Sequence, residues 1–325
     1  MLERLLRHGG WGIGLIRSPI SSLLDDSVRS DVEWLPLDMP HTFFADPFLI
    51  NEGGLTYCFL EEFSYATNRG KISYVSLDDL PAKRLRPREA IATPHHLSYP
   101  YLFRHEGSLL CVPENLESGR VAVWSARHFP DDWYERATLL PNFAGADPTV
   151  FRYQDRWWLF CTDGHNAPNA ELHAWYADDI FSTWRPHAGN PIKRDVASAR
   201  PGGTPFECNG RLFRPAQDCS ERYGGRLIIN EIVELSPEHF RERSVSALEP
   251  DRAGPFPEGL HTASGVGGLT VIDGNRLRFE PRQAARALRA YARKVLNSVP
   301  SAGTTAIARK TRHGRELDWA DCRDK

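Results

Sequence analysis

The segment Phe44-Ala45-Asp46-Pro47-Phe48-Leu49-Ile50 decides the fold, because similar segments recur along the chain. It reappears as Leu97-Ser98-Tyr99-Pro100-Tyr101-Leu102-Phe103 and as Gly145-Ala146-Asp147-Pro148-Thr149-Val150-Phe151. A shorter fourth copy is Gly203-Thr204-Pro205-Phe206. A repeat at a fixed spacing marks supersecondary units that bury their apolar faces against one another. The sequence therefore predicts a chain built from repeated β modules.

Each copy opens a predicted strand-turn-strand hairpin, and a second alternating segment follows it, at 71–75, 120–124, 171–176 and 226–230. The repeated positions are separated by 53, 48, 57 and 58 residues; they are Asp46, Tyr99, Asp147, Thr204 and a weaker fifth near Thr262. Four-stranded modules of this length fit neither a β-sandwich nor a β-helix. We therefore predict an all-β fold, a five-bladed β-propeller over residues 1–280, with the strand at 11–16 completing the last blade.

Composition supports this class and excludes others. The 325 residues include 25 Gly, 24 Pro and only two Met, which suits a turn-rich β protein. A net charge of −2 gives no general attraction to nucleic acid, so no nucleic-acid partner is expected. The six cysteines form no C-x-x-C pair, which favours free thiols over disulfides. The apolar run at 11–16 is too short for a signal or membrane helix, so we expect a cytoplasmic protein.

The region 281–325 has a different character and is expected to be a basic, partly disordered tail. Residues 282–297 are rich in Ala and Arg with apolar residues at helical spacing, which predicts a C-terminal amphipathic α-helix. From Arg282 to His313 there are eight Lys or Arg and no carboxylates, a pattern typical of helices on anionic membrane surfaces. The tail at 282–313 therefore predicts peripheral contact with the inner face of a membrane, with a docked or solvated helix as the alternative.

Asp46 and Asp147 occupy the same position in the first and third modules. Because the first strand of each propeller blade lines the central axis, their side chains are expected to converge. Paired carboxylates across a pocket are what glycosyl transfer or hydrolysis needs. The alternative is that Asp-Pro only begins a strand, since Asp favours turns and Pro fixes φ.

The ends of the predicted hairpins form a second polar ring, because Glu61-Glu62, Glu114-Asn115, Thr162-Asp163 and Gln217-Asp218 follow the apolar strands. Carboxylates buried without partners cost several kcal/mol, so these residues are expected to face a wet pocket or to pair with arginines. For each residue a structural hydrogen-bonding role is the alternative. The candidate substrate-binding residues are Glu62, His96, Tyr99, Asp163, Arg200, Gln217, Asp218, Tyr223 and His261.

Several of these segments together resemble the N-terminal propeller domain of plant glucosamine inositolphosphorylceramide transferases and its stand-alone bacterial relatives, over roughly residues 40–265. The segments are Ala45-Asp46-Pro47-Phe48, His96-Leu97-Ser98-Tyr99-Pro100-Tyr101, Val112-Pro113-Glu114, Gly202-Gly203-Thr204-Pro205-Phe206 and Gln217-Asp218-Cys219-Ser220-Glu221-Arg222-Tyr223-Gly224. More distantly the chain is similar to the five-bladed arabinanases, invertases and levansucrases.

The distant resemblance implies that Asp46 acts as base or nucleophile and that Asp147 orients and tunes the acid. Where those hydrolases place an acidic Glu, this chain has Arg200-Pro201-Gly202-Gly203. Glu114 is the candidate substitute for the acid. An arginine at that position suits an anionic group, because its planar fork pairs with two oxygens.

The resulting expectation is a carbohydrate-active enzyme, either a glycosyltransferase or a glycoside hydrolase, in the biosynthesis of an envelope polysaccharide or glycolipid. The substrate would be a sugar or glycolipid. The alternative is a non-catalytic module that binds a glycan or lipid head group for a partner glycosyltransferase, since the acid of the hydrolases is missing from its usual position. The plant proteins carry a separate transferase domain, so the resemblance does not imply their transferase activity for this chain. No cofactor and no metal ligand set are expected, although a central divalent ion such as calcium remains open.

Overall fold

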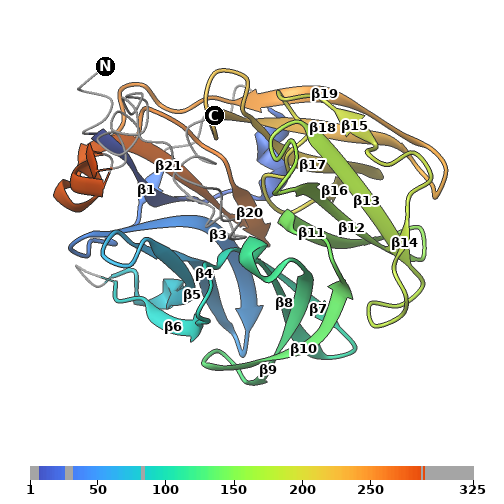
Figure 1. Ribbon diagram of the computed structural model, residues 1–325, viewed down its shortest axis with the longest axis horizontal. Coiled ribbons are helices and arrows are strands. Elements are labelled where there is room, and N and C mark those ends of the chain that lie inside the picture. The colour runs from blue at the N-terminus through green and yellow to red at the C-terminus, as the bar shows by residue number, and fades with distance from the viewer. Residues whose placement is uncertain (1–6, 26–31, 82–84, 287, 290–325) are drawn as a thin grey trace, which may run out of the picture. The chain divides into compact units, whose positions relative to one another are not determined.

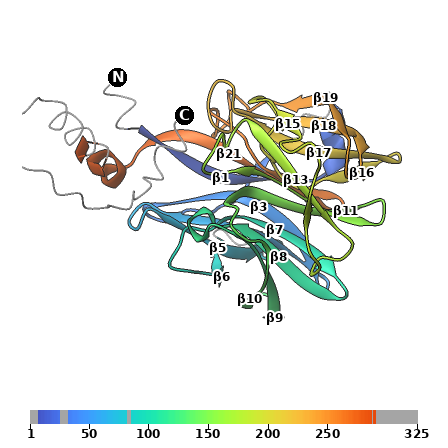
Figure 2. The ribbon, with the colours of Figure 1, turned by 45° about the vertical axis from the view of Figure 1, so that its right-hand side comes forward.

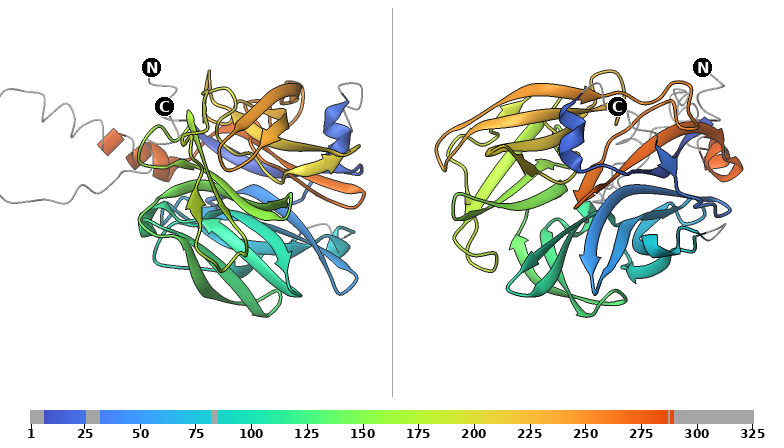
Figure 3. Two further views of the ribbon diagram at one scale, coloured as in Figure 1. Left: turned by 90° about the vertical axis from the view of Figure 1, so that its right-hand side faces the viewer. Right: turned by 180° about the vertical axis from the view of Figure 1, so that it is seen from behind.

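The computed structural model describes residues 7–25, 32–81, 85–286 and 288–289. The chain divides into two units, one from Gly10 to Arg276 and one formed by the chain ends. The larger unit is a five-bladed β-propeller, in agreement with the repeat in the sequence (Figure 1). Its sheets surround a common axis when viewed from the front and from behind (Figure 3).

The first four blades each begin with one copy of the repeated segment and run outward from the axis. The second alternating segments are the third strands, as predicted. The first and second blades comprise β3 (Thr42–Glu52), β4 (Leu55–Ser64), β5 (Arg69–Ser76) and β6 (Arg88–Ile91), then β7 (Ser98–His105), β8 (Ser108–Glu114), β9 (Val121–His128) and β10 (Asp132–Leu140).

The third and fourth blades follow the same plan with shorter strands at their margins. They comprise β11 (Gly145–Tyr153), β12 (Arg156–Asp163), β13 (Glu171–Ala177), β14 (Arg185–Pro186) and β15 (Lys193–Arg194), then β16 (Phe206–Cys208), β17 (Arg211–Asp218), β18 (Arg226–Leu235) and β19 (Phe240–Leu248). Among the described residues, three short 3₁₀ turns lie outside the sheets, η1 (Ile20–Leu24), η2 (Leu77–Asp79) and η3 (Leu116–Ser118).

The fifth blade combines strands from both ends of the chain, in the order β20 (Ala263–Val266), β21 (Leu269–Phe279), β1 (Arg7–Ile16) and β2 (Glu33–Trp34). The prediction that residues 11–16 complete the last blade is therefore confirmed. Pairing the first strand of the chain with the last hairpin closes the ring and removes an exposed sheet edge.

The repeated segment forms a β-bulge in each of the first three blades. In the first blade, Ala45 pairs with Glu61 and Phe48 with Phe59, so Asp46 and Pro47 together oppose one residue. The hairpins of the second and third blades shift register at the same point. An inserted residue bends a strand and re-aims its side chain, which is why such bulges recur beside functional sites.

The bulge residues have left-handed backbone conformations, with φ of 51° at Asp46, 46° at Tyr99 and 49° at Asp147. Such a φ costs a non-glycine residue about 1–3 kcal/mol and persists where its surroundings over-determine it. In the fourth copy the positive φ, 130°, falls on Gly203, one residue before Thr204. The repeat thus places unusual backbone at the inner end of four blades.

Apolar residues between the blades form the core. The neighbouring strands β3 and β7 run side by side (Figure 2), and Phe48 packs edge-on against Tyr99 across them. Cys58, Cys111 and Cys161 are fully buried, and all five cysteines within the described residues are free, as predicted. Cys322 lies outside the described residues.

In the smaller unit, residues 281–286 and 288–289 are helical, which confirms a short helix near the C-terminus. The rest of the predicted helix at 282–297 and of the basic segment to His313 lies outside the described residues. Within the described part of the chain, no helix is both long and apolar enough to cross a membrane.

Candidate active site at the propeller axis

Side chains from all five blades meet at the propeller axis. The hydroxyl of Tyr99, in the second blade, accepts a hydrogen bond of 2.7 Å from the backbone N–H of Gly203, which precedes β16 of the fourth. Because the second and fourth blades are not adjacent, this hydrogen bond between Tyr99 and Gly203 lies at the centre of the ring. We use the term axial cluster for the buried polar residues around it, namely Asp46, Glu114, Asp147, Arg200, Gln217, His261 and Asp273.

The bulges explain why acidic residues gather here. The backbone N–H of each bulge residue donates a hydrogen bond to a carboxylate of the preceding blade. Asp46 donates to Asp273 (3.1 Å), Tyr99 to Asp46 (3.2 Å) and Asp147 to Glu114 (3.0 Å). A buried N–H without a partner would cost about 1–3 kcal/mol, so these carboxylates have a structural role. The same contacts fix their positions around the axis.

Asp147 lies in a dense network of charge-assisted hydrogen bonds. Its Oδ2 atom accepts from Arg200 Nε and from Gln217 Nε2, both at 2.6 Å. Gln217 also donates to the carbonyl of Pro201 (2.8 Å), which fixes the orientation of its amide group. Burial raises the pKa of Asp147 to about 8, although the Arg200 guanidinium acts in the opposite direction.

The guanidinium of Arg200 contacts several groups of the protein. Besides Asp147, it contacts Asn169 Oδ1 (3.1 Å) and Glu114 Oε2 (3.5 Å), and it stacks over the ring of Tyr223 at 4.9 Å. Burial lowers its pKa, but Asp147, Tyr223 and Glu114 together outweigh burial and the net shift is upward. Arg200 therefore neutralises carboxylates of the protein, and the proposed pairing with an anionic substrate group stays a prediction.

Asp46 belongs to a second group of the cluster, with His261 and Asp273. Its Oδ1 accepts from the hydroxyl of Thr262 (2.8 Å) and lies 3.6 Å from His261 Nε2, whose Nδ1 is 2.5 Å from Asp273 Oδ2. Trp11 stacks on the imidazole at 3.9 Å. Burial raises the pKa of Asp46, and His261 partly opposes that rise.

Burial alone lowers the pKa of His261, but Asp273 and Asp46 outweigh it and raise the value to about 8. The charged imidazole therefore stabilises the folded protein fully below its unfolded pKa of about 6.5 and loses that contribution as the pH rises through 8. We expect the thermal midpoint of the wild type to fall between pH 6.5 and 8.5. His261→Asn should show a smaller fall, arising from Asp147, whose raised pKa acts in the same direction. Equal pH profiles for the two proteins would contradict this prediction.

Asp46, His261 and Asp273 are close enough to share a cation. However, both oxygens of Asp273 already accept hydrogen bonds, from the backbone of Asp46, His261 and Thr262 and from the imidazole. Calcium takes six to eight oxygen ligands, whereas this group offers two carboxylates and a nitrogen. The group does not fit calcium, and a central ion remains a prediction without support from these residues.

The structure brings together Asp46, Asp147, Glu114, Arg200, Gln217, His261 and Tyr99, with Tyr223 beside them. Four other predicted residues have local partners instead. Glu62 accepts from Ser73, Asp163 from the backbone of His165, and Asp218 from Arg226. The imidazole of His96 accepts from the backbone of Gly70 and faces Glu61 at 3.5 Å.

Asp273 is the member of the cluster that the sequence analysis missed. Its neighbours Gly274 and Asn275 are typical of a turn, yet all three lie within β21. A signal was present, because Asp273 ends the apolar run Val271-Ile272 just as Glu61 ends Phe59-Leu60. The fifth copy of the repeat lacks the Asp-Pro pair, so the repeat by itself does not point to Asp273.

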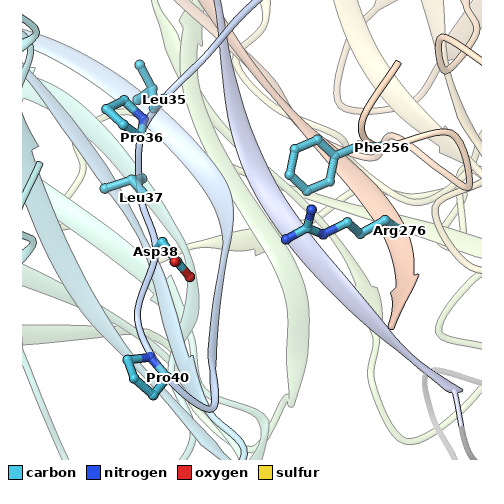
Figure 4. Close-up of a pocket in the computed structure, with 7 residues that line it drawn as sticks. All are labelled: Leu35, Pro36, Leu37, Asp38, Pro40, Phe256 and Arg276. Atoms are coloured by element: carbon cyan, nitrogen blue, oxygen red, sulfur yellow. The ribbon is translucent and has the colours of Figure 1, made fainter. Parts of the chain in front are cut away.

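A separate open hollow of about 680 Å³ lies between the segment before β3 and β21 (Figure 4). The guanidinium of Arg276 lies 5.0 Å from the centre of the Phe256 ring. None of the candidate site residues lines it. The lining residues are Leu35, Pro36, Leu37, Asp38, Pro40, Phe256 and Arg276.

With this geometry established, comparison with known proteins identifies the family. Residues 32–253 match the family described as glucosamine inositolphosphorylceramide transferase 1, N-terminal. The chain belongs to this family. Among curated members of the glucosamine inositolphosphorylceramide transferases, the protein of Arabidopsis thaliana is 35% identical over 223 residues, 66% of this chain. That of Oryza sativa subsp. japonica is 32% identical over 253 residues, 73% of the chain. The matched regions span 29% and 34% of those plant proteins.

Several solved structures share the fold of this chain, although their sequence identity to it is low. A putative glycoside hydrolase from Bacteroides ovatus superposes with a TM-score of 0.55 at 9% identity, covering 83% of this chain and 97% of that one. An α-L-arabinofuranosidase catalytic domain from Coprinopsis cinerea gives 0.52 at 13%, covering 82% and 96%. These similarities show the fold alone.

Proposed function

We propose that this protein is a carbohydrate-active enzyme that transfers or hydrolyses a glycosyl group during the biosynthesis of a glycolipid or envelope polysaccharide. The observation that carries the proposal is the convergence of Asp46 and Asp147 on the axis, each on a bulge with left-handed backbone. Asp46 serves as the base that takes a proton from the incoming hydroxyl. The name of the plant relatives, which refers to transfer onto a sphingolipid, supports a glycolipid substrate.

The direct test is to measure sugar release and transfer from a panel of activated glycosyl donors. We expect Asp46→Asn to lower turnover by about 10²–10⁴-fold, because that is the typical contribution of a positioned base. Glu114→Gln is measured beside it, and Asp163→Asn serves as the matched control, since Asp163 lies outside the axial cluster. Absence of turnover on every donor, with binding unchanged in Asp46→Asn, would refute an enzymatic role.

A second candidate function is a non-catalytic module that binds a glycan or lipid head group for a partner glycosyltransferase. The observation in its favour is that Arg200, where the related hydrolases place an acid, is paired with Asp147 and Glu114. The free thiols of the described cysteines suit a reducing compartment, so either function is proposed for the cytoplasmic side of a membrane.

The end of the chain supplies a proposed membrane contact. In the smaller unit, Phe279 and Leu288 are 62% and 46% exposed, and Arg282 and Arg289 are exposed beside them in the sequence. Exposed apolar and basic side chains together are typical of segments that bind anionic lipid surfaces.

We expect co-sedimentation with phosphatidylglycerol vesicles that falls several-fold on deletion of 282–325 or in Phe279→Ser. Phosphatidylcholine vesicles should bind little. Leu55→Ser is the matched control, because Leu55 is 41% exposed on a hairpin of the propeller. Binding that is unchanged by the deletion would remove the membrane proposal.

A further inference from the structure

The hydrogen bonds of the axial cluster distinguish one carboxylate oxygen from the others. Both oxygens of Asp273 accept from donors, as described above, and Asp46 accepts from Thr262 at Oδ1 and from the backbone of Tyr99 at Oδ2. Glu114 accepts from Ser98 at Oε1 and from the backbone of Asp147 at Oε2.

Asp147 differs from these three. Arg200 and Gln217 both donate to its Oδ2 atom, and no described residue donates to Oδ1. A carboxylate oxygen that accepts from no donor of the protein is less stabilised as an anion, whereas the same oxygen bearing a proton is itself a donor. The geometry therefore marks Oδ1 of Asp147 as the place where a proton is held most favourably.

The charges of the cluster require such a proton. Its four carboxyl groups, Asp46, Glu114, Asp147 and Asp273, face two cations, Arg200 and the charged His261. With all four ionised, two negative charges would be left buried without a partner. Buried groups avoid this cost by staying protonated. Among the described residues, Asp147 Oδ1 is the one oxygen of these carboxyl groups where a proton displaces no donor.

We propose that Asp147 is the general acid of this site and holds the transferable proton on Oδ1. This inference rests on the proposed function and replaces Glu114 as the candidate acid. Both oxygens of Glu114 accept hydrogen bonds, Oε1 from Ser98 of the same blade and Oε2 from the backbone of Asp147 in the next blade, so Glu114 acts as a positioning residue. Arg200 occupies the position where the related hydrolases place an acid. It lies next to the acid Asp147 and donates a hydrogen bond to its Oδ2 atom.

The proton balance of the step is complete without a further reactant. Asp147 gives its proton to the leaving-group oxygen as the bond between that oxygen and the anomeric carbon breaks. Asp46 accepts the proton of the incoming hydroxyl as the new bond forms. Asp147 is left as a carboxylate that Arg200 and Gln217 already contact, and exchange with solvent returns one proton to Asp147 and removes one from Asp46.

The ionisable surroundings of Asp147 agree with this role. The charged groups that act on it are Arg200 and His261, which favour the carboxylate, and Glu114 and Asp46, which favour the protonated form. The Tyr99 hydroxyl and the Cys161 thiol also face it, and burial raises the pKa of each. Burial likewise places the pKa of Asp147 at about 8, so the acid is protonated at neutral pH.

The location of the proton is tested without any substrate, by infrared spectroscopy of the whole chain. We expect a protonated-carboxyl band at pH 7 that fades as the pH rises through about 8. The band should be lost in Asp147→Asn and kept in Glu114→Gln. Because Asn resembles the neutral acid, Asp147→Asn should also leave the thermal midpoint at pH 7 nearly unchanged. A band that is lost in Glu114→Gln and kept in Asp147→Asn would overturn the proposal.

The donor role is tested with two glycosyl donors that differ in leaving group. With an alkyl glycoside, which needs protonation, Asp147→Asn should lose about 10²–10⁴-fold in turnover. With a nitrophenyl or phosphate leaving group the loss should be below about tenfold, whereas Asp46→Asn should lose activity on both donors. Equal losses for Asp147→Asn on both donors would overturn the role. If the wild type turns over neither donor, the proposed function and the donor role both fail, and the infrared result still decides where the proton lies.

Discussion

Gly203→Ala is expected to destabilise the propeller by more than about 4 kcal/mol, a large part of the about 5–15 kcal/mol by which native domains are stable. A Cβ atom at this position would lie 1.8 Å from the carbonyl oxygen of Ala263, and the φ of Gly203 is 130°. Ala263 also accepts from the backbone of Thr204 at 3.0 Å, so the oxygen cannot move away without breaking that bond. The fourth and fifth blades therefore depend on direct contact between two backbones at this point.

Urea denaturation, or the yield of folded protein where the variant does not fold, provides the measurement. Gly210→Ala is the matched control, because Gly210 also has a positive φ, 72°, but nothing lies within 4 Å of its added Cβ. The control should cost about 1–3 kcal/mol from backbone conformation alone. Similar losses in the two variants would show that the backbone contact with Ala263 is unimportant.

Arg200→Met is expected to cost about 3–5 kcal/mol, because it leaves the buried Glu114 carboxylate without its cation and removes a hydrogen-bond donor to Asp147 Oδ2. Arg200 lies 2.6 Å from Asp147 and 3.5 Å from Glu114, and both carboxyl groups are buried. Met fills a similar volume without a charge, so the loss reports on electrostatics more than on packing. Chemical denaturation at pH 7 measures the difference.

Two further variants make this result specific. Arg120→Met removes a surface ion pair in which Arg120 Nη2 donates to both carboxylate oxygens of Glu135. The two side chains are 42% and 34% exposed, so the substitution should cost less than about 1 kcal/mol. Adding Glu114→Gln to Arg200→Met should recover part of the loss, since it removes a charge that Arg200 compensates. Losses that simply add would contradict coupling between Arg200 and Glu114.

The repeat predicted the ring because each copy keeps the same alternation of apolar and polar residues. It also predicted that Asp46 and Asp147 meet, because equivalent positions of different blades converge on one axis. It was less informative about adjacent polar pairs such as Glu61-Glu62 and Thr162-Asp163. Successive side chains of a strand point to opposite faces, so each pair cannot share one environment. In the structure Glu62 accepts a hydrogen bond from Ser73 and Asp163 accepts one from the backbone of His165, both outside the axial cluster.

Arg200 and Asp273 show where reasoning from the sequence ends. The sequence showed that an arginine replaces an acid, and this suggested an anionic ligand. In the structure its guanidinium is shared by Asp147, Asn169 and Glu114, which lie on other strands and loops. Asp273 accepts a hydrogen bond from the backbone of Asp46, 227 residues away, although the fifth copy of the repeat lacks the Asp-Pro pair.

The sequence by itself determined the five-bladed ring, its closure by the N-terminal strand and the two aspartates that converge on the axis. These follow from local periodicity and from a spacing that each module repeats. Only the tertiary structure decided which carboxylates are paired, which oxygen is left without a donor and therefore where a proton is held. Those properties depend on burial and on charges brought together from different blades, and electrostatic interactions are set by distance in space rather than by separation along the chain.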